Sequence, residues 1–455
     1  MRLLDGFFRS PSVEPLFSDT ATVQAILDFE AALARAQAQA GIIPASTQAA
    51  IVAQCRAELF DLEALAQAMP SAGNLAIPLL KQLNALVGKS SPEAARYIHF
   101  GATSQDALDT ALVLQLRAAT RELLSDIEAI IAALAKLSSD HRATLLVART
   151  WLQHALPTTF GYVTAGWLDA MLQHRARLQW LLANALVLQF GGAAGTLAAL
   201  GSRGLSVTQH LAAELRLPQP RLPWHSSRER MGEVASALAL LCGTLAKVAR
   251  DLSLYMQTEV AELSEPPAAG RGGSSTMPHK QNPVATAAIL ASALRVPALA
   301  SSVLSGMHGE FQRSVGRWQA EWELLPEIAS LTAGAARQLA VLLPGIAVHK
   351  ERMRANLELT NGLIYAEAIS LALSEKLNRA SAHKLVEAAC RRAQSEGTHL
   401  REILSSDREV SSILDAAALK SLFEPANYLG SADVFIDSVL SAVEVHAPLP
   451  SPEKP

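Results

Sequence analysis

The sequence has 455 residues, of which 50% are hydrophobic and only 5% aromatic, and its formal net charge is −3. This length predicts two or three domains with a large core, and the abundance of alanine and leucine favours helices packed on helices over a β-rich fold. The small net charge excludes a general attraction to nucleic acid or anionic membranes, so local charge must hold any anionic ligand.

The three cysteines, Cys55, Cys242 and Cys390, lie far apart and form no CxxC pair. Their spacing predicts neither a disulfide framework nor a zinc or iron–sulfur site. The histidines show no HExxH spacing, and we expect no metal and no cofactor. Residues 1–6 include an acid where an export signal would need an apolar run. We therefore expect a cytoplasmic protein.

The first predicted helix covers residues 19–40. Ser18 or Asp19 can cap its N-terminus, an apolar stripe follows one face, and Gly41 ends it before Pro44.

A polar motif, HFGATSQDALDT, occupies residues 99–110. The hydroxyls of Thr103 and Ser104 precede a predicted helix, whose N-terminal amides can receive an anion. The same two residues, or Asp106, could simply cap the helix, and the segment taken alone favours capping.

Residues 107–345 are dominated by long helical patterns with few breakers. The first begins at about residue 107, and the others cover 161–188, 228–262, 284–306 and 319–342. Five such helices suit a bundle. Residues 178–202 carry no charge and are the only stretch that could imitate a membrane span, but their four glycines favour a buried helix followed by a turn. We expect no membrane contact.

The most distinctive segment is GSSTMPHKQNP at residues 273–283. Its prolines and glycine forbid a helix or strand where serines, a lysine and an amide gather, which indicates chemistry on irregular backbone. The glycine-rich run at 270–273 could form a nest for an anion, but Lys280 does not have Walker A spacing. A phosphate-loop interpretation is therefore weak.

Residues 346–447 contain shorter helical patterns, which predict a separate small domain. The tail from 447 to 455 has four prolines and is predicted to be disordered.

The segment at 273–283 resembles the signature loop of the fumarase/aspartase superfamily, Gly-Ser-Ser-x-Met-Pro-x-Lys-x-Asn-Pro, at every fixed position. Residues 27–34, 99–110 and 189–196 are similar to other segments of that superfamily. The resemblance implies an all-α fold of three domains, 1–106, 107–345 and 346–455, with a signature loop at 264–283 on a central five-helix bundle. It also implies a homotetramer in which three subunits each contribute one motif to every active site.

The resemblance assigns roles to individual residues. Ser274 would be the general base that removes a proton next to a carboxylate, which requires amides or cations to stabilise its alkoxide. His99 would assist catalysis. The residues that would bind substrate are Thr103, Ser104, Thr150, Trp151, Gln153, Ser275, Met277, Lys280, Asn282, Arg228 and Arg230. For the two arginines, solvated positions at the end of a bundle helix are an equally good interpretation.

A second motif, RTWLQHALPTTFG at 149–161, departs from the superfamily pattern at Trp151. Members that expel an amine or hydroxyl commonly have a histidine there, because a poor leaving group needs a proton as its bond breaks. A carboxylate, whose conjugate acid has a pKa of about 4, leaves without help. His154 could act as a displaced acid or a substrate ligand, and Trp151 could equally be an ordinary core aromatic.

The loss of the imidazole indicates a lactonisation, in which the attacking or leaving group is a carboxylate. Within the superfamily the sequence most resembles the bacterial 3-carboxy-cis,cis-muconate cycloisomerases, which form 4-carboxymuconolactone in the β-ketoadipate pathway. The implied partner is a small-molecule polycarboxylate. An argininosuccinate- or adenylosuccinate-type lyase that releases fumarate is an alternative, and Trp151 counts against it. A non-enzymatic, crystallin-like scaffold is another, and intact Ser274 and Lys280 count against that.

Overall fold

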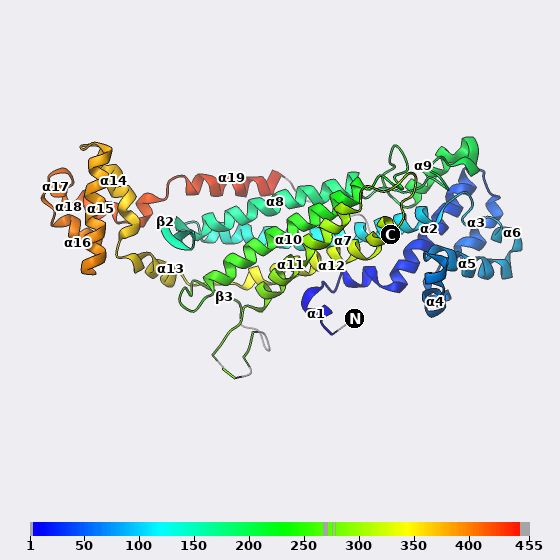
Figure 1. Ribbon diagram of the computed structural model, residues 1–455, viewed down its shortest axis with the longest axis horizontal. Coiled ribbons are helices and arrows are strands. Elements are labelled where there is room, and N and C mark those ends of the chain that lie inside the picture. Colours follow the sequence, from blue (N-terminus) through cyan, green and yellow to red (C-terminus); the bar gives the residue numbers. More distant parts are fainter. Residues whose placement is uncertain (1–2, 267–271, 275, 278, 446–455) are drawn as a thin grey trace. The chain divides into compact units, whose positions relative to one another are not determined.

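The computed structural model describes residues 3–266, 272–274, 276–277 and 279–445. Helices make up most of this part of the chain (Figure 1). The strands there form two small antiparallel sheets, β1 (Leu145–Thr150) with β2 (Gln153–Thr159), and β3 (Leu263–Ser264) with β4 (Ala347–Val348). The predicted all-α fold class is confirmed, and the short sheets are additions that the sequence patterns did not predict.

The five long helices predicted from apolar periodicity are present. They are α7 (Ser104–Asp140), α8 (Phe160–Asn184), α10 (Glu229–Tyr255), α11 (Val284–Ser305) and α12 (Arg317–Leu342). The stripe that predicted α7 is buried, because leucines and alanines spaced three or four residues apart lie on one helical face: Leu112, Leu116, Ala119 and Leu123.

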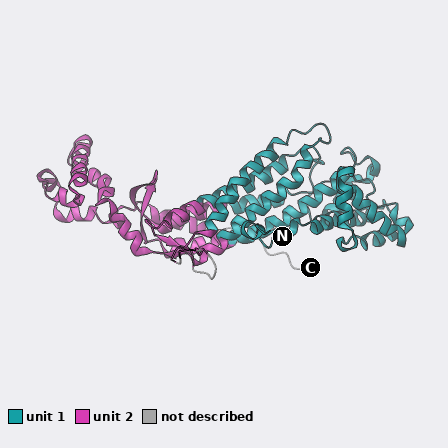
Figure 2. Ribbon diagram, turned by 60° about the horizontal axis from the view of Figure 1, so that its bottom comes forward, with its two compact units in different colours: residues 1–128, 174–247, 285–339 teal, residues 129–173, 248–284, 340–455 magenta. Residues whose placement is uncertain are grey.

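The chain forms two compact units, shown in separate colours in Figure 2. Unit 1 comprises residues 1–128, 174–247 and 285–339, and unit 2 comprises residues 129–173, 248–284 and 340–455. The helices α7, α8 and α10 each contribute residues to both units. The three-domain division expected from the sequence stays a prediction.

Unit 1 contains the predicted opening helix, α2 (Asp19–Gln39). The Ser18 hydroxyl caps it by accepting a hydrogen bond from the backbone N–H of Ala21, and Gly41 beyond its end has a φ of +68°. The other short elements of this unit are α1 (Asp5–Phe8), η1 (Glu14–Phe17), α3 (Ala45–Val52), η2 (Ala57–Leu59), α4 (Leu62–Ala72), α5 (Ala76–Ser90), α6 (Pro92–Ala95), η3 (Ala198–Arg203) and α9 (Gly204–Glu214).

Unit 2 contains the β1–β2 hairpin and the C-terminal helices. Val147 of β1 is fully buried in one apolar cluster with Leu357, Tyr365 and Leu400, so the base of the hairpin is anchored in the C-terminal core. The remaining elements of the unit are η4 (Leu343–Gly345), α13 (Lys350–Leu357), η5 (Glu358–Thr360), η6 (Leu363–Tyr365), α14 (Ala366–Ser374), α15 (Arg379–Glu396), α16 (Leu400–Ser405), α17 (Arg408–Ile413), α18 (Ala416–Leu422), η7 (Pro425–Tyr428) and α19 (Ala432–Val445). The predicted disordered tail, 447–455, lies outside the described residues.

Two helices in the described part of the chain, α10 and α11, are long and apolar enough to cross a membrane by length and composition alone. The core helices of soluble proteins pass the same test. The expectation that residues 178–202 are the only stretch able to imitate a membrane span is therefore wrong, because it considered only stretches without any charge. In the uncharged stretch that it singled out, 178–202, α8 ends at Asn184 and irregular backbone follows, as predicted for a helix and a turn.

Candidate active site

The first motif forms a tight turn that leads into α7. His99 has a φ of +56° and Gly101 a φ of +71°, and both lie in the left-handed region. A Cβ on Gly101 would lie 2.6 Å from a methyl carbon of Leu200, so glycine is required there for space as well as for conformation. The left-handed conformation costs a non-glycine residue roughly 1–2 kcal/mol, which makes His99 a position of stored strain.

A buried carboxylate holds this turn in place. The Asp106 side chain accepts hydrogen bonds from the backbone N–H groups of Thr103 (3.0 Å), Gly191 (2.9 Å) and Gly192 (2.9 Å). Its Oδ1 also lies 2.6 Å from Nε2 of His225, and neither side chain is more than 4% exposed. Asp106 thus caps α7 by reaching back to Thr103, and it ties the first motif to the glycine-rich segment predicted at 189–196.

This capping arrangement leaves the Thr103 hydroxyl for other contacts. Its Oγ1 accepts a hydrogen bond of 3.1 Å from the guanidinium of Arg313, which also donates to the carbonyl of Ala193 (3.2 Å) and, through Nε, to Oε1 of Gln105 (3.0 Å). Ser104 is half-buried at the first position of α7. The motif therefore presents two hydroxyls, a helix N-terminus and an exposed arginine together, a combination that suits a carboxylate ligand.

His99 is paired with an acid from α2. Its Nδ1 lies 2.6 Å from Oε1 of Glu30, whose side chain is only 1% exposed. Burial by itself lowers the pKa of His99, but the Glu30 carboxylate, with a smaller effect from Asp106, outweighs burial, and the pKa is raised. The imidazolium form is favoured as a result.

The second motif is a β-hairpin with a strained tip. Thr150 pairs with Gln153 across a two-residue turn made of Trp151 and Leu152, which have φ values of +53° and +63°. Such turns normally use Asn-Gly, because both central residues are left-handed. Trp151 is 97% exposed and Leu152 74% exposed. The interpretation of Trp151 as a core aromatic is wrong for this chain, because its indole projects from the hairpin.

The end of the hairpin next to this turn is held by a largely buried ion pair within unit 2. Arg149 donates two hydrogen bonds, of 2.9 and 2.7 Å, to the carboxylate of Glu262, which is fully buried and also accepts from Nδ2 of Asn356 (2.7 Å). His154 lies on β2 opposite Arg149. Burial, with a smaller effect of Arg149, lowers the pKa of His154, and its buried Nδ1 has no hydrogen-bond partner among the described residues. A neutral imidazole at neutral pH is a weak proton donor.

The described part of the signature loop places Ser274 against backbone amides. Its Oγ accepts hydrogen bonds from the N–H groups of Thr276 (3.3 Å) and Met277 (3.1 Å). The loop closes on itself where the N–H of Asn282 donates to the carbonyl of Gly272 (2.8 Å), and Lys280 is exposed. Two amides at one hydroxyl oxygen are the stabilisation that a serine alkoxide needs. The predicted ligand Ser275, and part of the glycine-rich run at 270–273, lie outside the described residues.

The two arginines near residue 229 differ in their surroundings. Arg228 is 3% exposed and forms ion pairs with Asp109 and Glu321, while its guanidinium lies 4.8 Å from the centre of the Trp224 ring. Because two buried carboxylates occupy its donors, the geometry favours a structural role over substrate binding, and the solvated position is wrong for this residue. Arg230 is half-buried and donates to the carbonyl of Asn184. Its substrate role stays a prediction.

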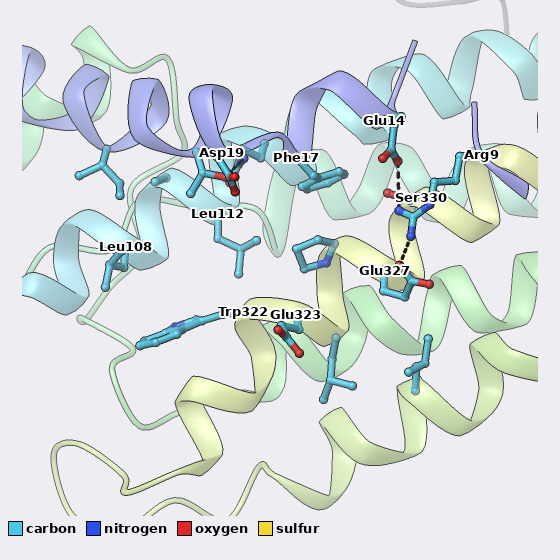
Figure 3. Close-up of a pocket in the computed structure, with 17 residues that line it drawn as sticks. Arg9, Glu14, Phe17, Asp19, Leu108, Leu112, Trp322, Glu323, Glu327 and Ser330 are labelled. Atoms are coloured by element: carbon cyan, nitrogen blue, oxygen red, sulfur yellow. Dashed lines mark hydrogen bonds and ion pairs between the residues drawn. The ribbon is translucent and has the colours of Figure 1, made fainter. Parts of the chain in front are cut away.

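A pocket of about 670 Å³ in unit 1 is lined by none of the predicted site residues. Figure 3 shows Arg9 at one end of it, paired with Glu14 and Glu327. We assign it no catalytic role. Across the described residues, no group of three or more His, Cys, Asp or Glu side chains could hold a metal ion. The expectation of no metal and no cofactor stays a prediction.

Comparison with known proteins decides the family. Residues 10–298 match a family model described as lyase, and residues 362–439 match one described as adenylosuccinate lyase C-terminus. The chain belongs to the fumarase/aspartase superfamily.

Three similar proteins have names that state the same enzymatic activity. A 3-carboxy-cis,cis-muconate cycloisomerase of Pseudomonas aeruginosa is 50% identical, over 98% of this chain and 97% of the relative. That of Bradyrhizobium diazoefficiens is 49% identical, over 97% of this chain and 98% of the relative. The crystal structure of the 3-carboxy-cis,cis-muconate lactonizing enzyme from Pseudomonas putida matches with a TM-score of 0.92 at 48% identity, covering 98% of this chain and 99% of that one.

The sequence patterns did not predict two residues of the candidate active site. Glu30 lies in the segment 27–34, which was noticed only for its similarity to the superfamily, and Arg313 lies just before the predicted helix at 319–342, outside every motif. A buried acid within an apolar helical stripe is the signal that could have identified Glu30. For Arg313 the sequence carries no comparable signal, because its partner Thr103 is 210 residues away.

The Asp106 network predicts the effect of Asp106→Asn. The amide would remove the negative charge facing His225 and would turn two N–H donors toward groups that are themselves donors, so the free energy of unfolding should fall by about 3–5 kcal/mol. Urea unfolding followed by circular dichroism measures this. Asp140→Asn, at the exposed end of the same helix, is the matched control and should unfold close to wild type; equal stability of the two variants would contradict the network.

The strained hairpin tip predicts that Leu152→Gly raises the free energy of unfolding. Glycine adopts the positive φ of the turn without strain, so the free energy of unfolding should rise by roughly 0.5–1 kcal/mol after the greater flexibility of unfolded glycine is counted. The matched control is Leu294→Gly, an exposed leucine inside α11, which should lose stability. Losses of equal size in both variants would mean that the turn is not strained.

Proposed function

We propose that the protein is a 3-carboxy-cis,cis-muconate cycloisomerase that forms 4-carboxymuconolactone. The observation that carries this proposal is Trp151 at the hairpin tip, where members that expel an amine or hydroxyl commonly have a histidine. The near full-length identity to relatives of that name supports the same reaction.

The reaction is an intramolecular addition. One carboxylate oxygen of the substrate forms a bond to a carbon of the conjugated diene, and the displaced π electrons move to the carboxylate at the other end, giving an enolate-like dianion there. A proton then adds to the neighbouring carbon. Because a substrate trianion becomes a lactone with two carboxylates, the overall change takes up one proton.

No imidazole is required at the attacking oxygen. A carboxylate is already an anion at neutral pH, since its conjugate acid has a pKa of about 4, and in the reverse direction it leaves unassisted. The lowered pKa of His154 is compatible with this scheme, because a neutral imidazole beside Arg149 contributes little acid. His154 then acts as a substrate ligand rather than as the proton donor.

The developing negative charge needs fixed donors. In the first motif these are the hydroxyls of Thr103 and Ser104 and the guanidinium of Arg313, together with the imidazolium of His99 four residues before Thr103. In the signature loop Lys280 and Asn282 hold substrate. Donors that are already in place before the reaction lower the barrier most where charge appears.

Ser274 transfers the proton. In the lactonising direction its hydroxyl gives a proton to carbon, and the alkoxide that remains is stabilised by the N–H groups of Thr276 and Met277. In the reverse direction the alkoxide removes that proton. The same two amides therefore serve both directions.

The assembly that we propose is a cytoplasmic homotetramer in which each active site combines motifs from three subunits. The exposed indole of Trp151 supports it, because a large aromatic side chain held in water at a hairpin tip is explained by a partner surface.

The proposal predicts that the purified protein removes the conjugated-diene absorbance of 3-carboxy-cis,cis-muconate and that Ser274→Ala abolishes this, with a loss on the order of 1,000-fold or more in kcat. The oligomer should remain intact by size-exclusion chromatography. Ser412→Ala, an exposed serine of unit 2, is the control and should keep full activity. A near-normal rate in Ser274→Ala would remove that residue from the mechanism, and release of fumarate from argininosuccinate or adenylosuccinate would replace the proposed reaction.

The role given to Trp151 predicts that Trp151→His does not accelerate ring closure. An added imidazole has no poor leaving group to protonate, while the indole's contact area is lost, so kcat/KM for 3-carboxy-cis,cis-muconate should stay equal or fall. Initial rates from the diene absorbance measure this. A large increase in kcat would show that an acid at this position is limiting and would count against the proposed substrate.

A further inference from the structure

Glu30 is a buried acid whose position no sequence motif explains. It lies in α2, on a helical face that is mostly apolar, and its side chain is 1% exposed. A carboxylate in such surroundings is strongly destabilising unless a partner compensates it. Its partner is His99, whose Nδ1 is 2.6 Å from Oε1.

The same face of α2 also fixes the backbone next to that histidine. Gln37 lies seven residues after Glu30, two helical turns further along the same face, and its Nε2 donates a 2.5 Å hydrogen bond to the carbonyl of Phe100. Two side chains of one helix thus bind consecutive residues of the left-handed turn: Glu30 binds the imidazole of His99, and Gln37 binds the backbone carbonyl of Phe100. The side chains of Glu30 and Gln37 are both buried.

We propose that Glu30 is a positioning residue for the first motif. By binding Nδ1 it keeps the His99 imidazole charged and in one orientation, so that only Nε2 remains to donate to a substrate carboxylate held beside Thr103 and Ser104. Glu30 itself does not contact the substrate. The inference rests on the proposed function, because it assumes an anionic ligand at this motif.

The charged groups around His99 support this assignment. Glu30 from α2 and Asp106 from α7 both raise the pKa of His99 and together outweigh its burial, while Asp106 is itself paired with His225. Cys55, which interacts electrostatically with Glu30, stays a neutral thiol because burial raises its pKa. Arg313 donates a hydrogen bond to the Thr103 hydroxyl and so adds a cation to the first motif.

The sign of the pH dependence follows from this arrangement. An anion binds best to the imidazolium form, which is populated below the pKa of His99 and is lost as the pH rises through it. In Glu30→Gln the opposing charge is gone while burial remains, so the pKa falls. Anion binding should then weaken at a lower pH than in the wild type, and the variant should match the wild type only in acid.

The experiment compares the wild type with Glu30→Gln in two measurements. Calorimetric titration with tricarballylate, an unreactive saturated tricarboxylate, should show affinity roughly 10-fold weaker for the variant at pH 8 and nearly equal affinity at pH 5.5. The kcat/KM of the variant for 3-carboxy-cis,cis-muconate should begin to fall, as the pH is raised, at a lower pH than that of the wild type. Parallel pH profiles for variant and wild type in both measurements would overturn the proposal.

Two further variants separate positioning from a general structural effect. Gln37→Met removes the hydrogen bond to the carbonyl of Phe100 in the same turn without changing any charge at His99. It should weaken the binding of tricarballylate equally at both pH values. In a double-mutant cycle with His99→Gln, adding Glu30→Gln should cause no further loss of affinity, because Glu30 acts only through the imidazole. An additional 10-fold loss in the double variant would show a separate role and contradict the inference.

If Glu30→Gln does not fold, Glu30→Asp provides the test. Its shorter side chain keeps the charge but moves it away from Nδ1 of His99. The fall of binding and of kcat/KM at high pH should therefore shift to lower pH by a smaller amount than in Glu30→Gln. Binding of tricarballylate with the expected pH shift, but no turnover of the muconate, would refute the proposed reaction while supporting the role of Glu30.

Discussion

The Asp106 carboxylate is the interaction on which the first motif depends. It is buried where water cannot hydrate it, and it is balanced by three backbone N–H groups and the imidazole of His225. These donors belong to segments about 85 and 119 residues away in sequence as well as to the turn itself. Because an uncompensated buried carboxylate is very unfavourable, the segments must arrive together. One turn further along α7, Asp109 pairs in the same way with Arg228 and with the indole N–H of Trp318. The start of this helix is therefore a rigid, polar and buried support for the hydroxyls that it presents.

The second motif is built on the same principle in unit 2. The bidentate pair of Arg149 and Glu262, reinforced by Asn356, fixes the hairpin next to its tip, and Val147 anchors its strands in the C-terminal core. This rigid support allows an unfavourable tip, where Trp151 and Leu152 occupy left-handed conformations in solvent. Strain held by well-packed surroundings is common at functional sites, and here it fixes the direction of the indole.

The chemistry assigned to the site is consistent with its electrostatics. The chain has a net charge of −3, so attraction of a tricarboxylate must come from a few cations at the motifs. His99 is favoured in its charged form by Glu30, Arg313 is bonded to Thr103, and Lys280 is exposed in the loop. His154, by contrast, is favoured as a neutral imidazole. Charge is thus concentrated on groups that bind anions rather than on a proton donor for a leaving group, as expected for carboxylate addition.

The sequence by itself determined the helices, the loop and the departure at Trp151. Periodic apolar residues, capping residues and prolines act over one to a few helical turns, so α2, α7 and the irregular loop follow from local physics. The superfamily and the unusual aromatic residue could likewise be recognised from contiguous motifs. Only the tertiary structure decided the pairing of Glu30 with His99, of Arg313 with Thr103 and of Asp106 with His225, and the burial of Arg228. Each of these joins residues 69 to 210 positions apart, and no local pattern specifies which buried charge will meet which partner, because that choice depends on how whole helices pack.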